Sequence, residues 1–118
     1  LFPYTTLFRS NSQRGRVLSI VAQLNSDPDY VLAGESTSPG EMRKLMLAQG
    51  MLESPELIVV DEPTNYLDLG STIALERLLS EYPGALLLVS HDLSLVDSAT
   101  SIKWSIQRSN DNFELVVQ

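Results

Sequence analysis

Apolar residues recur at three- and four-residue intervals near the start of the chain, at Val17, Ile20, Val21 and Leu24. This spacing predicts an amphipathic helix over about residues 14–24. A short second helix is expected at about residues 28–32, because Asp27 can cap it and Pro28 suits the first helical position. The first third of the chain is therefore predicted to be helical.

A longer helix is predicted at about residues 39–53. Its apolar stripe is made of Met42, Leu45, Met46 and Leu52 and is widened by Leu47, Ala48 and Met51. Ser38, Pro39 and Glu41 have the spacing of a capping box, in which serine and glutamate side chains satisfy the free N–H groups of the first turn. Pro55 ends the helix, because proline disfavours a helical residue before it.

Two unbroken apolar runs follow, at residues 57–60 and 85–89. Runs that do not alternate are typical of parallel strands that are covered on both faces. Between the runs, apolar residues repeat at helical spacing up to Tyr82, and Pro83-Gly84 closes the segment. A strand–helix–strand crossover is expected, with the carboxyl ends of both strands at one edge of the sheet.

The last part of the chain predicts a short helix and a hairpin. Residues 93–98 are expected to be helical. Apolar and polar residues alternate from Ile102 to Ile106, and residues 113–117 are also strand-like. The intervening loop at residues 108–112 predicts that these two strands pair in an antiparallel hairpin.

The composition limits the classes of function. The chain has 118 residues, 43% of them hydrophobic, enough for one domain with a modest core. Its 15 acidic and 8 basic residues give a net charge of −7, so no direct contact with nucleic acid is expected from this segment. No apolar run approaches the roughly 20 residues of a membrane helix, so no direct membrane contact is expected. The lack of cysteine excludes disulfides and thiolate metal sites and fits a cytoplasmic location.

Residues 1–10 require separate treatment. They read Leu-Phe-Pro-Tyr-Thr-Thr-Leu-Phe-Arg-Ser, which is the in-frame translation of a common sequencing adapter. Pro3 and the lack of a basic start argue against a signal peptide. We interpret residues 1–10 as an artefact, which implies that the natural chain is truncated before Asn11.

Polar residues follow both predicted strands. Asp61 and Glu62 end the first run, at the edge where open α/β sheets bind ligands. One carboxylate can hold hydrated Mg²⁺, and the other can orient or deprotonate a water. His91 follows the second run and would face the same crevice as Glu62. The alternatives are that the acidic pair only terminates a strand and that His91 is an ordinary loop residue.

A third candidate element is the start of the helix at residue 39. The free N–H groups and the positive end of the helix dipole favour an anion there, and Gly40 would let a phosphate approach the backbone. Simple helix capping by Ser38 is the alternative. Residues 65–68, which include Asn65 and Asp68, form a polar loop just beyond the acidic pair.

Together these motifs resemble the C-terminal half of an ATP-binding-cassette (ABC) ATPase domain. Residues 38–42, Ser-Pro-Gly-Glu-Met, resemble the signature loop, and residues 57–62 the Walker B strand. Residues 65–68 resemble the D-loop, and residues 90–92, Ser-His-Asp, the switch histidine. The implied fold class is α/β, a partial P-loop-NTPase-like domain whose N-terminal half is missing.

The combination Asp-Glu-Pro-Thr-Asn-x-Leu-Asp with Ser-His-Asp is similar to the ABC-F branch, soluble tandem-cassette proteins that act on ribosomes. The signature is more similar to the second cassette of antibiotic-resistance members. The resemblance implies a helical subdomain with the signature helix over residues 11–53. Residues 54–118 would run from Walker B through the switch histidine to the terminal hairpin. The implied partners are a second cassette and the ribosome.

By resemblance, the intact protein binds and hydrolyses ATP with Mg²⁺ between two head-to-tail cassettes. Asp61 would bind Mg²⁺ through water, Glu62 would be the general base or water-orienting carboxylate, and His91 would contact the γ-phosphate. The other residues that match nucleotide-contacting motifs of the family are Ser38, Gly40, Glu41, Asn65 and Asp68.

The sequence departs from the family pattern in three respects. Pro39 replaces the first glycine of the signature, and Tyr66 stands where ABC-F proteins usually have histidine. No Gly-x-x-x-x-Gly-Lys-[Ser/Thr] phosphate loop occurs, so we expect the chain by itself to hydrolyse no ATP. Two alternatives to an ABC-F ATPase stay open, a nucleotide-binding subunit of an ABC transporter and a non-catalytic α/β binding module.

Overall fold

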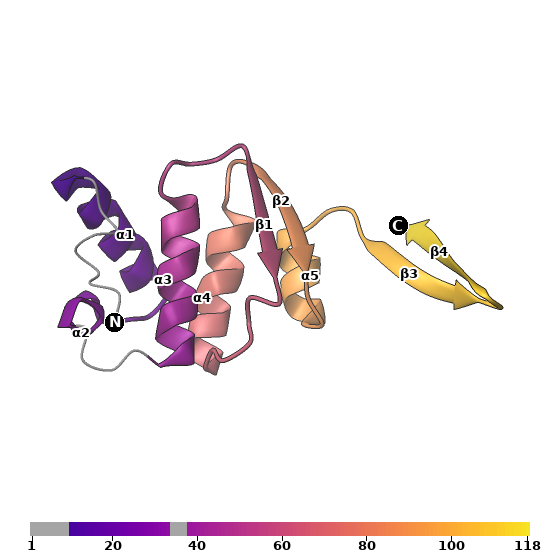
Figure 1. The fold of residues 1–118 in the computed structure, drawn as a ribbon, viewed down its shortest axis with the longest axis horizontal. Helices are drawn as coiled ribbons and strands as arrows, with labels where there is room; N and C mark the ends of the chain where they lie inside the picture. The colour runs from indigo at the N-terminus through magenta and orange to yellow at the C-terminus, as the bar shows by residue number, and fades with distance from the viewer. Residues whose placement is uncertain (1–9, 34–37) are drawn as a thin grey trace.

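A computed structural model describes residues 10–33 and 38–118. Five helices and four strands lie within these ranges (Figure 1), in the order α1 Asn11–Gln23, α2 Pro28–Ala33, α3 Pro39–Met51, β1 Leu57–Asp61, α4 Leu69–Ser80, β2 Ala85–Val89, α5 Leu93–Ala99, β3 Trp104–Ser109 and β4 Asn112–Val117. All the predicted elements are therefore present. The adapter-like segment, apart from Ser10, and residues 34–37 lie outside the described residues.

Capping side chains set the starts of two helices, and α1 begins at Asn11 rather than at about residue 14 as its apolar stripe predicted. Ser10 caps α1, its Oγ accepting a hydrogen bond from the Gln13 N–H at 3.2 Å. Asp68 caps α4, its Oδ1 accepting from the Ser71 N–H at 2.7 Å. Such bonds satisfy N–H groups that the helix itself leaves unpaired.

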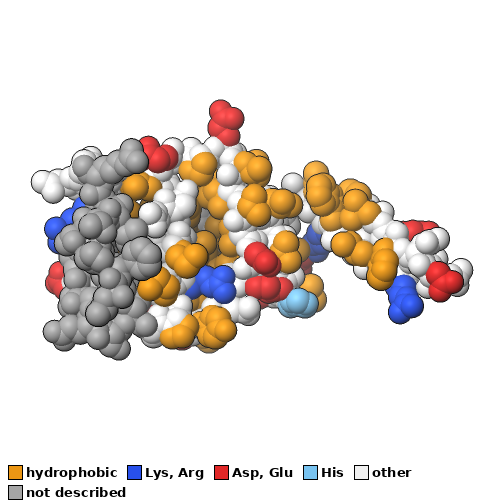
Figure 2. All heavy atoms as spheres, viewed as in Figure 1, with side chains coloured by type: hydrophobic (Ala, Val, Ile, Leu, Met, Phe, Trp, Pro, Cys, Tyr) orange, Lys and Arg blue, Asp and Glu red, His pale blue; other side chains and the backbone are white. Residues whose placement is uncertain are grey.

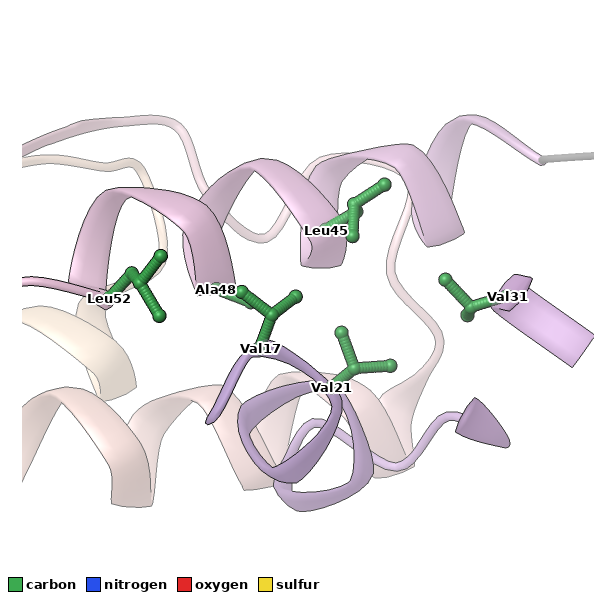
Figure 3. Packing of buried hydrophobic residues seen from close by; sticks show 6 residues of the cluster. All are labelled: Val17, Val21, Val31, Leu45, Ala48 and Leu52. Atoms are coloured by element: carbon green, nitrogen blue, oxygen red, sulfur yellow. The ribbon is translucent and has the colours of Figure 1, made fainter. Parts of the chain in front are cut away.

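The helices α1, α2 and α3 share a small apolar core (Figure 3). Val17 and Val21 on α1 meet the buried stripe of α3, and Val31 on α2 closes one end. The buried stripe consists of Leu45, Ala48 and Leu52, each no more than 6% exposed, whereas Met42 and Met46 of the predicted stripe are 39% and 63% exposed. Burial of these side chains supplies the main force that holds α1 against α3.

The strands β1 and β2 pair in parallel, as predicted, with Leu57 opposite Ala85 and Asp61 opposite Val89. One face of this pair packs on helices. The inward side chains of this pair contact apolar residues of α3 and α4; they are Ile58, Val60, Leu86 and Leu88. Leu86 and Leu88 also pack against the buried cluster that contains Leu95 of α5. The sheet thus lies over a helical layer in which Leu75, Leu79 and Leu95 are each no more than 2% exposed.

The expectation that both faces of the sheet are covered is not met by the described residues. The outward residues Leu57, Val59, Leu87 and Val89 are between 42% and 64% exposed. The prediction came from unbroken apolar runs, which supply apolar side chains to both faces. The described helices cover only one face, so the other presents bare aliphatic surface. None of the helices in the described ranges is long and apolar enough to cross a bilayer.

The antiparallel hairpin of β3 and β4 projects away from the helices and the parallel strands (Figure 1). Its two-residue turn contains Asn110, whose φ of 53° suits a tight hairpin turn. One face of the hairpin is apolar, and each of its residues, Trp104, Ile106, Phe113, Leu115 and Val117, is more than half exposed. Figure 2 shows hydrophobic side chains gathered at the surface of the hairpin.

Replacing Leu75 with alanine should destabilise the chain by about 2–5 kcal/mol, because Leu75 is fully buried between α1, α4 and α5. Ile73→Ala is the matched control on the same helix, since Ile73 is 59% exposed and should change stability by less than about 0.5 kcal/mol. Denaturant unfolding of the three proteins measures both values. Equal losses for the two variants would show that this core does not hold the fold together.

Candidate functional site

The carboxyl ends of β1 and β2 form the first part of the site. Their register places Asp61 beside Val89, so both strands end at the same edge of the sheet. The Glu62 N–H donates to the Val89 carbonyl at 2.7 Å, which continues the pairing by one residue. The chain segments that follow each strand therefore begin side by side.

This arrangement brings Glu62 and His91 together. The His91 backbone N–H donates to Glu62 Oε2 at 3.3 Å, and His91 Nδ1 hydrogen-bonds to Glu62 Oε1. The Glu62 side chain is 22% exposed, whereas that of His91 is 97% exposed. Acidic side chains and the histidine lie next to one another on the face shown in Figure 2. The carboxylate is thus held in place while the imidazole remains open to a ligand.

Glu62 adopts a strained backbone conformation. Its φ of 44° lies in the left-handed region, which non-glycine residues rarely occupy and which costs on the order of 1 kcal/mol. The bonds to Val89 and His91 hold the residue there. Backbone strain of this kind concentrates at functional sites, and here it fixes the direction of a single carboxylate.

Asp61 is exposed at the end of β1. Its backbone carbonyl accepts a hydrogen bond from Arg43 Nη1 on α3 at 3.3 Å. Among the described residues, no three histidine or acidic side chains are grouped closely enough to hold a metal ion by themselves. An exposed carboxylate is nevertheless the oxygen donor that Mg²⁺ prefers, and Mg²⁺ commonly takes its other ligands from water and phosphates. Asp61 therefore has the chemistry of a magnesium ligand, but only together with ligands from outside the described residues.

The start of α3 forms the second part of the site. Ser38 caps the helix, its Oγ accepting from the Glu41 N–H at 3.2 Å. Gly40 is buried, and a Cβ added there would lie 2.5 Å from the carbonyl oxygen of Tyr66. We expected this glycine to leave room for a phosphate, but the space is filled by the loop after β1. Gly40 is thus needed for the packing of that loop on α3.

Glu41 faces the protein interior, and its partners were not foreseen. Ser26 Oγ donates to Glu41 Oε2 at 2.6 Å, and Lys44 Nζ donates to Glu41 Oε1 at 3.2 Å. Both carboxylate oxygens of Glu41 thus bond to Ser26 and Lys44. The predicted bond from the Glu41 side chain back to the Ser38 N–H is replaced by these two bonds. The three-residue spacing of Glu41 and Lys44 is a sequence signal for an ion pair. Nothing in the sequence pattern pointed to Ser26 or to Arg43.

Asn65 and Asp68 lie in the segment between β1 and α4. Asn65 is exposed in a turn, and its N–H donates to the Glu62 carbonyl at 3.3 Å. The Ser71 hydroxyl, the Ser71 N–H and the charge of Lys44 together hold the pKa of Asp68 below its ordinary value. Tyr66, between them, has a φ of 67° and is 73% exposed. The loop thus connects the acidic pair to α3 through Tyr66 and to α4 through Asp68.

Comparison with known proteins gives several clear similarities. The chain matches no protein-family model. It is 48% identical over 69 residues to the putative ATP-binding protein YdiF of Bacillus subtilis, which covers 58% of this chain and 11% of YdiF. It is 44% identical over 77 residues to the ribosome protection protein VmlR of the same organism, covering 65% of this chain and 14% of VmlR.

A more distant relative extends the match along the chain. Elongation factor 3A of Saccharomyces cerevisiae is 36% identical over 88 residues, covering 73% of this chain and 8% of that protein. The chain therefore spans only between 8% and 14% of the length of these three curated relatives.

Gly40→Ala should destabilise the chain by about 1–3 kcal/mol, because its methyl group would force α3 and the Tyr66 carbonyl apart. Gly50→Ala is the matched control on the same helix. A Cβ at Gly50 meets nothing within 4 Å, so alanine should stabilise the helix by up to about 1 kcal/mol. Denaturant unfolding checks both values. Stabilisation by Gly40→Ala would contradict the close contact of Gly40 with the Tyr66 carbonyl.

Asp68→Asn should reduce stability in a pH-dependent way. Asparagine still caps a helix but carries no charge. Because folding lowers the pKa of Asp68, its carboxylate adds stability above the unfolded-state pKa of about 4, and this contribution is lost as the pH falls through the lower folded-state pKa. Urea unfolding from about pH 7 to pH 3 should show the difference between wild type and variant shrinking below about pH 4. A stability difference between wild type and variant that is independent of pH would show that folding does not lower the pKa of Asp68.

Proposed function

This chain is part of an ABC ATPase domain of the ABC-F type, and we propose that it supplies two partial nucleotide sites to an ATP hydrolase. The observation that carries the proposal is the bonded pair of Glu62 and His91 beside Asp61, at the shared edge of β1 and β2. Ligands of open α/β sheets bind at this edge. A nucleotide there would meet a fixed carboxylate, an open imidazole and an exposed metal-binding carboxylate.

At this first site, Glu62 orients a water molecule or removes its proton for attack on the γ-phosphate. His91 holds Glu62 through Nδ1, and its other ring nitrogen, Nε2, contacts a phosphate oxygen. Asp61 would hold Mg²⁺ through water, and the bound ion would supply positive charge that offsets the charge of the phosphates. The fixed position of Glu62 spares the cost of aligning it during the reaction.

The start of α3 completes the nucleotide site of a second cassette. Ser38 and the free N–H groups of the first turn contact a phosphate, since helix N-termini favour anions, while Gly40 serves the packing of the loop after β1 on this turn. Asn65 and Asp68 lie in the loop that meets the other cassette. Glu41 contributes by holding the helix start, since both of its carboxylate oxygens bond within this chain.

The proposal extends to the complete protein. Residues 1–10 are an adapter artefact, residues 11–53 belong to the helical subdomain, and residues 54–118 contain the Walker B to switch-histidine core with the hairpin. A phosphate loop and a second cassette are supplied by the rest of that protein. The names ribosome protection protein VmlR and energy-dependent translational throttle protein EttA, the latter 39% identical over 71 residues, support a cytoplasmic protein that acts on the ribosome in translation or antibiotic resistance.

The test is ATP hydrolysis by the complete protein. Glu62→Gln should lower kcat by at least about 100-fold while ATP binding is retained, because the amide keeps the shape but cannot accept the proton. Glu114→Gln on the exposed hairpin is the matched control and should hydrolyse ATP like wild type. Full activity of Glu62→Gln would overturn the proposed function.

The 118-residue chain alone should show no steady ATP hydrolysis, since it contains no phosphate loop. Phosphate release from the purified chain measures this directly. Hydrolysis that disappears in Glu62→Gln would show that the chain forms a full site without a phosphate loop. The proposal that the chain supplies only partial sites would then be wrong.

A further inference from the structure

A partly buried polar cluster of Ser26, Glu41 and Lys44 adjoins the first turn of α3. Lys44 Nζ donates to Ser26 Oγ at 2.8 Å and to Glu41 Oε1 at 3.2 Å, and Ser26 Oγ donates to Glu41 Oε2 at 2.6 Å. The lysine side chain is only 4% exposed and the glutamate side chain 20% exposed. Each member of the cluster thus bonds to both of the others.

Net stability is a weak reason for this arrangement. Removing a lysine and a glutamate from water costs several kcal/mol for each charge, and their attraction often does no more than offset that cost. A buried ion pair is better suited to fixing a geometry, because the low local dielectric penalises any arrangement that separates the charges. The cluster therefore specifies where Glu41 lies.

The position of Glu41 determines the position of the helix start. Its own backbone N–H donates to the Ser38 cap, so its main chain bonds to the cap and its side chain bonds to the cluster. Ser26 lies in the turn between α1 and α2, which is attached to the helical core through Val21 and Val31. On another side, Gly40 abuts the Tyr66 carbonyl. The first turn of α3 is thus fixed from two directions.

We propose that Lys44 is a positioning residue for nucleotide hydrolysis, acting with Ser26 through Glu41 to hold Ser38 and the first N–H groups of α3 toward a phosphate. This inference rests on the proposed function. It assigns the cluster to the second partial site, in which the helix start contacts the nucleotide of the other cassette. A displaced helix start would leave ATP bound to the other cassette but poorly aligned for reaction, so the loss would fall on kcat.

The test compares substitutions of Lys44 in the complete protein. Lys44→Met keeps the length of the side chain but removes the charge and the donors, and it should lower kcat about tenfold with the affinity for ATP within about twofold of wild type. Lys44→Arg restores the charge and the donors and should recover kcat to within about threefold. Lys103→Met removes the chain's other lysine, which is exposed in an ion pair with Asp97, and should leave kcat unchanged.

Ser26→Ala is a milder variant in case Lys44→Met does not fold. It removes one hydroxyl, leaves the ion pair, and should lower kcat about threefold without changing the affinity for ATP. Ser94→Ala is the matched control. Ser94 also donates to a glutamate, Glu76 Oε2 at 3.2 Å, but at an exposed position on α5. It should have wild-type kcat.

The outcomes distinguish this inference from the function on which it rests. Wild-type kcat in both Lys44→Met and Ser26→Ala, with Glu62→Gln inactive, would overturn the positioning role and leave the function intact. A lowered melting temperature of Lys44→Met with unchanged kcat would assign the cluster to folding alone. If the complete protein hydrolyses no ATP, the proposed function fails and this inference fails with it.

Discussion

Parallel pairing of β1 with β2 in a single register is the constraint on which the site depends. With Asp61 opposite Val89, the two strands end together, and the Glu62 N–H is bonded to the Val89 carbonyl. The loop after β2 therefore begins beside the loop after β1. This places His91 within hydrogen-bonding distance of Glu62. A register shifted by one residue would move each apolar side chain to the opposite face, so the buried core and the site are specified together.

The helical layer brings the two proposed partial sites next to each other at this edge. Packing of α3 against α1 and under the sheet places its N-terminus next to the loop that follows the acidic pair. Gly40 permits close contact with Tyr66, and Arg43 reaches the Asp61 carbonyl. The residues that would act on one nucleotide and those that would contact another are therefore connected through direct packing. The bare apolar face of the sheet indicates where further elements of the domain would pack.

Apolar periodicity and apolar runs predicted most of the helices and strands, because burial of one apolar stripe or run decides whether a segment forms, and capping residues predicted α2. Periodicity misplaced the start of α1, which the Ser10 cap decides, and it gave no start for α4, which the Asp68 cap decides. The proximity of Glu62 and His91 was predictable from the rule that parallel strands end at one edge. The contact of Gly40 with Tyr66 and the bonds of Lys44 to Ser26 were not, since they join segments that only tertiary packing brings together.

The most direct test is the structure of the complete Glu62→Gln protein with ATP and Mg²⁺. The account predicts a γ-phosphate between Gln at position 62 and His91 of one cassette, with the metal near Asp61. It also predicts that Ser38 at the start of α3 contacts the nucleotide bound to the other cassette, with Lys44 still bonded to Glu41. A nucleotide bound away from the shared edge of β1 and β2, or a Ser38 that faces no phosphate, would contradict it.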